Sequence, residues 1–161
     1  MVCRSGPIAP LCGTRSPVRQ TERLFLTHFS DLGLAEPILR AVSSQGYDTP
    51  TPIQQQVIPA MLAGKDVLGT AQTGTGKTAA FVLPILHALS TEKTRGSSKG
   101  CRALIMAPTR ELAMQIVDSV RTYGEGSRIS VTLVVGGLKI NKQIKAMERG
   151  VDVVVATPGR L

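Results

Sequence analysis

The pattern of apolar and polar positions divides the chain into two parts. Between residues 34 and 62, apolar side chains recur at three- and four-residue spacing, which predicts amphipathic helices. After residue 100, short β-branched runs alternate with helical patterns. Strands that alternate with helices form right-handed βαβ units, so the pattern predicts an α/β fold with a mainly parallel sheet flanked by helices. The expected strands are 102–107, 129–135 and 151–156, and the expected helices of this second part are 109–123 and 138–149.

Residues 71–78, Ala-Gln-Thr-Gly-Thr-Gly-Lys-Thr, form a glycine-rich stretch where the pattern changes. An apolar run over 66–70 predicts a strand before it, and a helical pattern follows it to about Leu89. Gly74 and Gly76 admit backbone conformations that a side chain would forbid. A loop of this kind turns successive N–H groups toward an anion, with the positive end of the next helix behind them. The context therefore predicts a phosphate-binding loop.

Lys77 and Thr78 carry the chemistry expected of this loop. The Lys77 ammonium can reach β- and γ-phosphates, and the Thr78 hydroxyl can ligate Mg²⁺. Ala71 departs from the usual loop pattern, which has Gly at the first position. The alternative is a glycine-rich turn that binds nothing, but the position of Gly-Lys-Thr between a strand and a helix argues against it.

Small, hydroxyl and cationic residues follow each strand expected after residue 100. In open α/β sheets, ligands bind beyond the carboxyl ends of the strands. Hydroxyls, free N–H groups and Arg side chains grip a sugar-phosphate backbone without reading its bases. The alternative for each is an ordinary strand-to-helix turn, with Thr109 as a helix cap and the glycines as turn formers. The residues are Pro108, Thr109 and Arg110, then Gly136 and Gly137, then Thr157, Pro158, Gly159 and Arg160.

Composition and charge indicate what kind of hydrophobic core the chain forms and what kind of partner it binds. A length of 161 residues predicts one domain, and 42% hydrophobic residues suffice for a core. Aromatic residues make up only 3%, so the core must be aliphatic, as suits a parallel sheet covered by helices. A net charge of +8 and a pI near 9.9 favour a polyanionic partner. Charge alone does not separate RNA, DNA and lipid, and a merely soluble basic protein is the alternative.

Cysteine, histidine and hydropathy patterns argue against other classes of site. The chain has three cysteines, an odd number, and their spacing does not match a metal site; they are Cys3, Cys12 and Cys101. This pattern indicates a reducing, intracellular compartment. His28 and His87 have no ligand-spaced partners and are interpreted as surface or packing residues. No apolar run approaches the ~20 residues that span a bilayer, so no membrane association is expected.

Residues 1–28 differ from the rest of the chain. They hold three Pro, two Gly and four Arg, and Glu22 is their only acid. Because they show no helical or strand period, they are predicted to be a disordered basic tail. Their Arg-rich, acid-poor composition also resembles an organelle transit peptide, and a start site chosen upstream of the real one is a further alternative.

Five motifs of the chain resemble those of the DEAD-box ATP-dependent RNA helicase family and occur in the family's order. Within the family, the chain most resembles the bacterial RhlE-like group. Phe29 and the run 46–54, Gly-Tyr-Asp-Thr-Pro-Thr-Pro-Ile-Gln, resemble the glutamine motif that recognises adenine. The resemblance implies that Tyr47 stacks on the base and that Gln54 hydrogen-bonds its edge. Residues 71–78 resemble motif I, where Ala is normal for the family at the first position. The implied ATP-binding residues are Phe29, Tyr47, Gln54, Ala71, Gln72, Thr73, Gly74, Thr75, Gly76, Lys77 and Thr78, with Lys77 and Thr78 in the catalytic role and Thr78 on Mg²⁺.

The strand ends resemble the family's RNA-contact motifs. Residues 108–113, Pro-Thr-Arg-Glu-Leu-Ala, resemble motif Ia, the pair 136–137 resembles the paired-glycine motif, and 157–160 resemble motif Ib. The resemblance implies that they hold single-stranded RNA by its phosphates and sugars. It also implies a RecA-like P-loop NTPase fold, ATP and Mg²⁺ as cofactors, RNA bound through its backbone, a cytoplasmic location and no stable oligomer. The expected parts are the tail 1–28, a glutamine-motif region 29–56 and a partial helicase ATP-binding domain 57–161.

The chain departs from the family pattern after motif Ib. It contains no Asp-Glu dipeptide, hence no Asp-Glu-Ala-Asp box, and no Ser-Ala-Thr motif. A second RecA-like lobe with its arginine finger is also absent from the sequence. The missing strands would lie inside the sheet. We therefore expect an incomplete first lobe, an amino-terminal piece that by itself neither hydrolyses ATP in response to RNA nor unwinds duplexes.

Three hypotheses of function remain at this point. The first is an ATP-dependent RNA helicase, an ATP hydrolase represented here by part of its first lobe. The second is a non-catalytic remnant that binds ATP or RNA. The third is a different phosphate-loop enzyme, such as a DNA helicase or a transporter ATPase. Gln54 upstream of the loop and the Pro-Thr-Arg-Glu-Leu-Ala run argue against the third.

Overall fold

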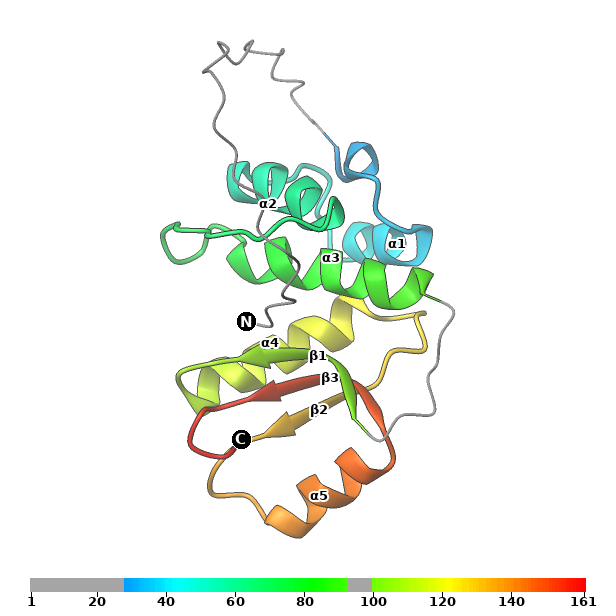
Figure 1. Ribbon diagram of the computed structural model, residues 1–161. Helices are drawn as coiled ribbons and strands as arrows, with labels where there is room; N and C mark the ends of the chain where they lie inside the picture. The colour runs from blue at the N-terminus through cyan, green and yellow to red at the C-terminus, as the bar shows by residue number, and fades with distance from the viewer. Residues whose placement is uncertain (1–27, 93–99) are drawn as a thin grey trace, which may run out of the picture.

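The computed structural model describes residues 28–92 and 100–161, and its elements follow the predicted order (Figure 1). The first part holds a short 3₁₀ helix, η1 (Phe29–Leu32), and helices α1 (Glu36–Ser44), α2 (Pro52–Leu62) and α3 (Lys77–Thr91). The second part holds β1 (Cys101–Met106), α4 (Arg110–Tyr123), β2 (Val131–Val134), α5 (Ile140–Glu148) and β3 (Val151–Ala156). The tail predicted to be disordered lies outside the described residues except for His28.

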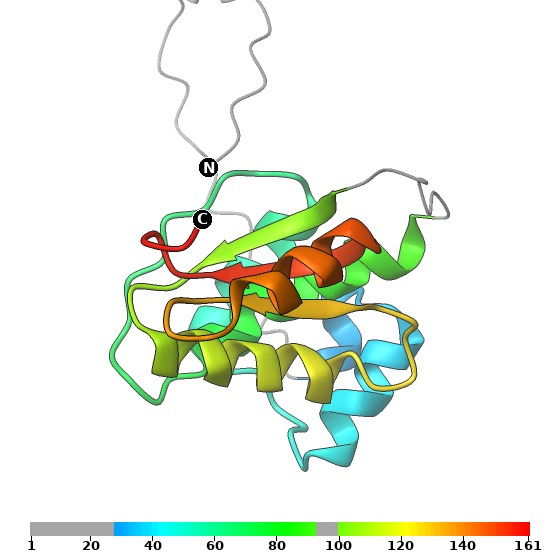
Figure 2. The same ribbon diagram turned by 90° about the horizontal axis from the view of Figure 1, so that it is seen from below.

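The three strands form one parallel sheet in the order β1-β3-β2, which confirms the predicted α/β fold. The central strand β3 pairs on both sides, since Val155 aligns with Ile105 of β1 and with Leu133 of β2. The segment from Val153 to Ala156 is at most 1% exposed. The crossovers through α4 and α5 run in opposite directions across the sheet, so right-handed connections place the two helices on opposite faces (Figures 1 and 2).

A layer of helices adjoins the sheet on the side of α4. Helix α3 packs against α2 and also against α4, which in turn contacts β2 and β3 (Figure 1). The side chains at the centre of these contacts are aliphatic, as the scarcity of aromatic residues predicted. The largest of them that are fully buried include Ile38, Ile58, Leu83 and Leu86.

The strand predicted over residues 66–70 is wrong. This segment has no regular secondary structure, and it is exposed, with Leu68 at 96% and Val67 at 40%. A parallel strand needs a neighbour for its hydrogen bonds, and no strand of the described residues pairs with it. Instead, a cavity of about 570 Å³ separates the segment from Ile105 and Met106 of β1, an edge strand of this sheet.

A polar cluster fastens the amino-terminal ends of the strands. Asp152 at the start of β3 accepts hydrogen bonds from the amide and the hydroxyl of Ser130, both at 2.8 Å. Arg102 of β1 donates to the Asp152 carboxylate at 3.3 Å and to Glu92 at 3.1 Å. Burial raises the pKa of Asp152, but the hydrogen bonds from Ser130 and Arg102 outweigh it, so that this pKa lies below its usual range. Asp152 is therefore ionised at neutral pH.

Candidate nucleotide site and nucleic-acid interface

The glycine-rich loop leads directly into the first turn of α3. Gly74 and Gly76 both have φ of +81°, in the left-handed region that only glycine adopts without strain. Gly76 is the N-cap of α3, so Lys77 and Thr78 form the first residues of the helix. The unpaired N–H groups of that turn and the positive end of the helix dipole therefore face the loop. This geometry suits an anion.

The loop is closed by its own hydrogen bonds. The Lys77 ammonium donates to the carbonyl oxygen of Ala71, at the start of the loop. The Thr75 hydroxyl donates to the carbonyl of Gln72 at 2.8 Å. Gln72, Thr73 and Gly74 are exposed at the loop's tip, whereas its two ends are half-buried. A triphosphate would have to replace the carbonyl that Lys77 contacts.

Helix α2 holds the loop from the other side through Thr51 and Gln54. The Thr51 hydroxyl donates to the carbonyl of Thr75 at 2.8 Å, and Gln54 Nε2 donates to the carbonyl of Gly76 at 3.2 Å. Gln54 Oε1 accepts from the Thr51 amide at 2.8 Å, which completes a capping box at the start of α2. A Cβ at position 76 would lie 2.4 Å from Gln54 Nε2, so this contact also requires glycine. The glutamine is 6% exposed, yet its amide retains one further donor hydrogen and one lone pair.

A small pocket next to Gln54 brings the predicted adenine residues together. Its volume is about 190 Å³, and its lining includes Phe29, Tyr47, Gln54, Gly76 and Tyr123. The Tyr47 side chain is 54% exposed, whereas Phe29 is buried in the core. Burial raises the pKa of the Tyr123 hydroxyl, and Tyr47 adds to the rise, so Tyr123 is neutral at physiological pH.

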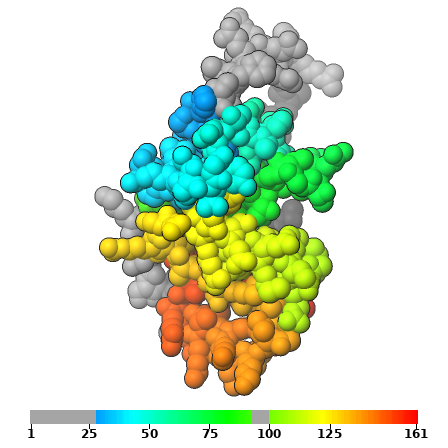
Figure 3. Space-filling view, turned by 180° about the vertical axis from the view of Figure 1, so that it is seen from behind, coloured from blue at the N-terminus to red at the C-terminus, as the bar shows by residue number. Residues whose placement is uncertain are grey.

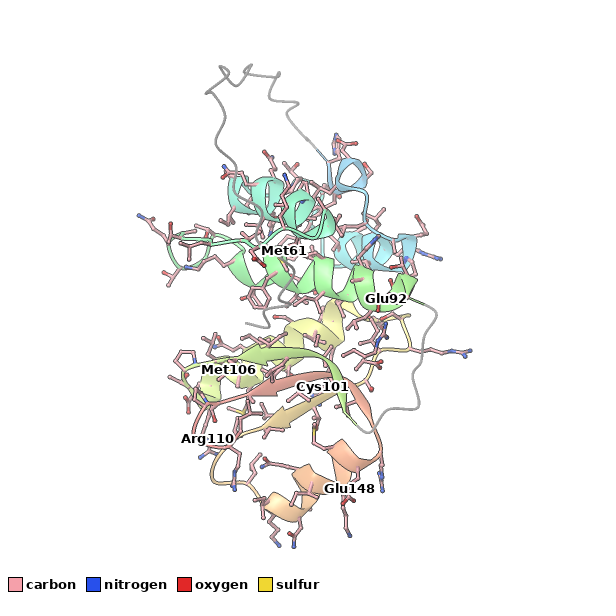
Figure 4. All side chains as sticks on the ribbon, in the orientation of Figure 1. Met61, Glu92, Cys101, Met106, Arg110 and Glu148 are labelled. Atoms are coloured by element: carbon pink, nitrogen blue, oxygen red, sulfur yellow. The ribbon has the colours of Figure 1, made fainter. Side chains whose placement is uncertain are left out.

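The predicted RNA-contact residues gather beyond the carboxyl ends of the three strands. These ends and the loop before α3 lie on the same side of the molecule (Figure 1). Pro108, Thr109 and Arg110 are exposed, and Arg110 projects from this end of the molecule next to the end of β1 (Figure 4). The Thr109 hydroxyl accepts a hydrogen bond from the Leu112 amide at 3.2 Å, so Thr109 caps α4. This helix cap is the alternative to an RNA contact that the sequence pattern left open.

Two arginines meet at the turn after β2. A Cβ at Gly137 would lie 2.5 Å from Arg110 Nη1, and Gly137 has φ of +79°. Arg160, which follows β3, donates from Nε to the carbonyl of Val135 at 3.1 Å and from Nη2 to the carbonyl of Leu138 at 2.9 Å. Arg160 thus brackets the turn, while Arg110 lies against it and has no hydrogen-bonding or ionic partner within residues 28–92 and 100–161.

The third strand end is less open than the first. Thr157 is 8% exposed, and its amide extends the sheet by donating to the carbonyl of Val134 at 3.1 Å. Pro158 and Gly159 are exposed in the turn that follows, and Gly136 of the neighbouring turn is half-buried. The exposed part of this strand end is therefore the turn at 158–159.

Sequence reasoning missed Thr51 and Gln143 as residues that support these sites. Thr51 has a signal that would have found it, since Thr-x-x-Gln at the start of a helix matches a capping box. Gln143 has none: it stands among lysines in a basic helix, but it is 7% exposed and donates to the carbonyl of Val135 at 3.0 Å.

The described part of the chain contains neither a metal-binding cluster nor a membrane-spanning helix. Within residues 28–92 and 100–161, no group of three or more His, Cys, Asp or Glu side chains is placed to hold a metal ion. None of the helices in those residues has the length and apolar character that a bilayer crossing requires. His87, interpreted as a surface or packing residue, is half-buried and accepts a hydrogen bond from the Ala35 amide through Nδ1 at 2.9 Å.

Comparison with known proteins decides the family. Residues 51–161 match the family model described as DEAD/DEAH box helicase. The chain belongs to the DEAD/DEAH box helicase family. This match begins at Thr51 and therefore includes Gln54, the phosphate loop and all three strand ends of this DEAD-box chain.

Two named helicases and one solved structure are similar to this DEAD-box chain. It is 47% identical over 133 residues to the ATP-dependent RNA helicase CshA of Limosilactobacillus reuteri, covering 83% of this chain and 26% of the relative. It is 52% identical over 136 residues to the ATP-dependent RNA helicase DeaD of Haemophilus influenzae, covering 83% of this chain and 21% of the relative. The crystal structure of a DEAD box protein from the hyperthermophile Methanococcus jannaschii matches with a TM-score of 0.73 at 36% identity, over 83% of this chain and 35% of that one. The chain thus spans about a quarter of the length of these curated relatives, and the fold is that of part of a DEAD-box RecA-like domain.

Proposed function

We propose that this chain binds ATP through its first half and the backbone of single-stranded RNA through its second, as part of an ATP-dependent RNA helicase. The observation that carries the proposal is the hydrogen bond from Gln54 Nε2 to the Gly76 carbonyl. It places an amide with unused hydrogen-bonding capacity beside a loop whose glycines suit phosphate. The named relatives are ATP-dependent RNA helicases, which supports the same reading.

In the proposed complex, each residue of the first half has a separate task. Lys77 leaves the Ala71 carbonyl and contacts the β- and γ-phosphates, while the amides at the start of α3 hold the phosphate oxygens. Thr78 ligates Mg²⁺, which neutralises phosphate charge when bound. Tyr47 stacks on the adenine, and Gln54 offers its remaining donor and acceptor to the base edge. ATP hydrolysis and duplex unwinding are proposed for the longer protein.

In the second half, the proposed RNA contacts are made without reading the bases. Arg110 is exposed, and its guanidinium offers N–H donors along its edges to phosphate oxygens. The amides of Gly136, Gly137 and Gly159 offer backbone N–H groups. Arg160 uses two of its five N–H donors on the turn it brackets and keeps the others. Such contacts release counterions, so the affinity should fall steeply as salt rises.

Two titrations of the purified chain test this proposal. In the first, a fluorescent ATP analogue with Mg²⁺ is displaced by ATP or by GTP, and displacement by ATP at lower concentration is expected. In the second, a fluorescein-labelled ten-nucleotide uridine RNA is titrated at 50 and 200 mM salt, with weaker binding expected at the higher concentration. Equal displacement by ATP and GTP would contradict the base assignment, and an affinity that salt does not change would contradict the phosphate contacts.

A further inference from the structure

The buried amide of Gln143 is the one polar side chain of α5 that enters the interior next to the turn at 136–138. Its Nε2 donates to the carbonyl of Val135 at 3.0 Å. Its Oε1 is buried and has no hydrogen-bond partner within the described residues. A buried amide that makes only one of its four possible hydrogen bonds weakens the fold compared with an apolar side chain of the same length. Packing alone therefore does not explain a glutamine here.

Gln143 shares its acceptor with Arg160. The Val135 carbonyl has two lone pairs, and it accepts from Gln143 Nε2 and from Arg160 Nε at 3.1 Å. Val135 is the last buried residue before the turn, with 1% exposure, and the sheet's own ladder ends one residue earlier at Val134. The carbonyl is therefore held by two side chains where strand pairing no longer holds it.

The turn that this carbonyl starts is the point where three separate elements converge. Arg160 also donates to the Leu138 carbonyl at 2.9 Å, so its guanidinium spans the turn from one end to the other. Arg110, from the start of α4, lies against Gly137. A shift of the Val135 carbonyl would move Arg160, the turn and the surface that Arg110 packs on. The contact from Gln143 reaches the same carbonyl from α5.

We infer that Gln143 is a positioning residue that fixes the Val135 carbonyl, and through it the Arg160 guanidinium and the turn at 136–138, in the arrangement that grips a nucleic-acid backbone. Gln143 itself touches no ligand. Its contribution is to hold the turn and Arg160 in place before RNA arrives, so that less freedom is lost on binding. This inference rests on the proposed RNA binding, but its structural part does not depend on it.

The test variant is Gln143→Met, which keeps the length of the side chain and removes the amide. The matched control is Gln115→Met, the same change at an exposed position of α4. For Gln143→Met we expect amide hydrogen exchange in residues 136–139 to quicken by at least threefold and the Kd for the labelled ten-nucleotide uridine RNA to rise by about threefold to tenfold. The Tm and the affinity for the ATP analogue should stay the same or rise. Gln115→Met should leave all four quantities unchanged.

Each outcome decides the inference. Faster exchange at 136–139 with weaker RNA binding, at a Tm that is unchanged or higher, supports it. Unchanged exchange and unchanged RNA affinity overturn it. A lower Tm with a parallel loss of ATP-analogue affinity also overturns it, because Gln143 would then be a general structural residue. If the unmodified chain binds no RNA, the proposed function fails, and the exchange rates alone decide whether Gln143 holds the turn.

Discussion

The two halves of the described chain differ in charge and in how they hold their candidate binding groups. Residues 28–92 are helical, hold three Lys or Arg against five Asp or Glu, and hold their phosphate loop by contacts from α2. Residues 100–161 contain the sheet, hold nine Lys or Arg against five Asp or Glu, and present their candidate groups on exposed turns. The space-filling view shows α1 and α2 at one end of the molecule and α5 at the other (Figure 3).

This difference suits two different ligands. A nucleotide is small and is recognised in a pocket whose few polar groups are fixed in advance, as Gln54 and Thr51 fix the loop. An RNA backbone is long and is bound by positive charge spread over a surface. Residues 100–161 carry such an excess of positive charge. If this comparison is correct, substitutions in one half should change one affinity and leave the other unchanged.

The largest expected effect comes from Lys77→Ala. It removes the charged donor that would contact the triphosphate, and a hydrogen bond to a charged group contributes ~1.5–3 kcal/mol, so affinity for the ATP analogue should fall by about tenfold to a hundredfold. RNA affinity should not change. The measurement is fluorescence titration with both ligands, with Lys65→Ala, another lysine of the helical half, as the control. A parallel loss of RNA affinity would break the separation of the halves.

Gln54→Ala should mainly reduce the preference for adenine. The variant loses the amide that would reach the base edge, and also the 3.2 Å bond to the Gly76 carbonyl. We expect ATP and GTP to displace the analogue at similar concentrations, with a loss of about fivefold to tenfold for ATP. Gln55→Ala, which changes the neighbouring glutamine, is the control. An unchanged ratio of ATP to GTP affinity in Gln54→Ala would exclude this residue as the base reader.

Gly137→Ala should lower stability, because Gly137 has φ of +79°, where a residue with a Cβ is strained. It should lower RNA affinity too, because the new Cβ would lie 2.5 Å from Arg110 Nη1 and displace that side chain. Backbone strain of this kind costs about 1–3 kcal/mol, which corresponds to a Tm lower by roughly 2–10 °C. Gly136→Ala is the matched control for stability, since a Cβ there meets nothing within 4 Å. Equal Tm values for the two variants, measured by thermal unfolding, would contradict the left-handed backbone conformation at Gly137.

The smallest effect concerns Asp152 and depends on pH. Because its pKa is lowered in the folded chain, its ionised form stabilises the fold above the unfolded pKa of ~3.9, and this contribution is lost as pH falls through the folded value. At pH 7, Asp152→Asn should lower the Tm by roughly 2–6 °C, and the gap from the unmodified chain should shrink below pH ~4. Asp118→Asn, in an exposed ion pair, should change the Tm little at any pH. A gap for Asp152→Asn that stays constant with pH would contradict the assignment.

The sequence predicted the order of elements because that order follows from local patterns. The glycines of the loop, the β-branched strands and the helix after Gly76 are visible as short periodic runs. The run 66–70 was misassigned because its composition is that of a strand, but a strand exists only where a partner supplies hydrogen bonds.

Contacts between residues far apart in the sequence could not be predicted from local patterns. Nothing in the local pattern joins Gln143 to the Val135 carbonyl or Arg102 to Asp152, because each pair meets only once the sheet has formed. Arg160 shows the same limit in another form. It was predicted as an RNA contact, and the structure adds that part of its guanidinium holds a turn of the protein itself.

The most direct test of two separate binding halves is backbone amide NMR of the chain with each ligand in turn. Adding the ATP analogue with Mg²⁺ should shift the amides of residues 71–78 and of Gln54. It should leave those of 109–110, 136–138, 157 and 159–160 in place. Adding the ten-nucleotide uridine RNA should shift the second set and leave the first. Shifts of both sets by both ligands, or no shift in residues 71–78 with the ATP analogue, would contradict the account.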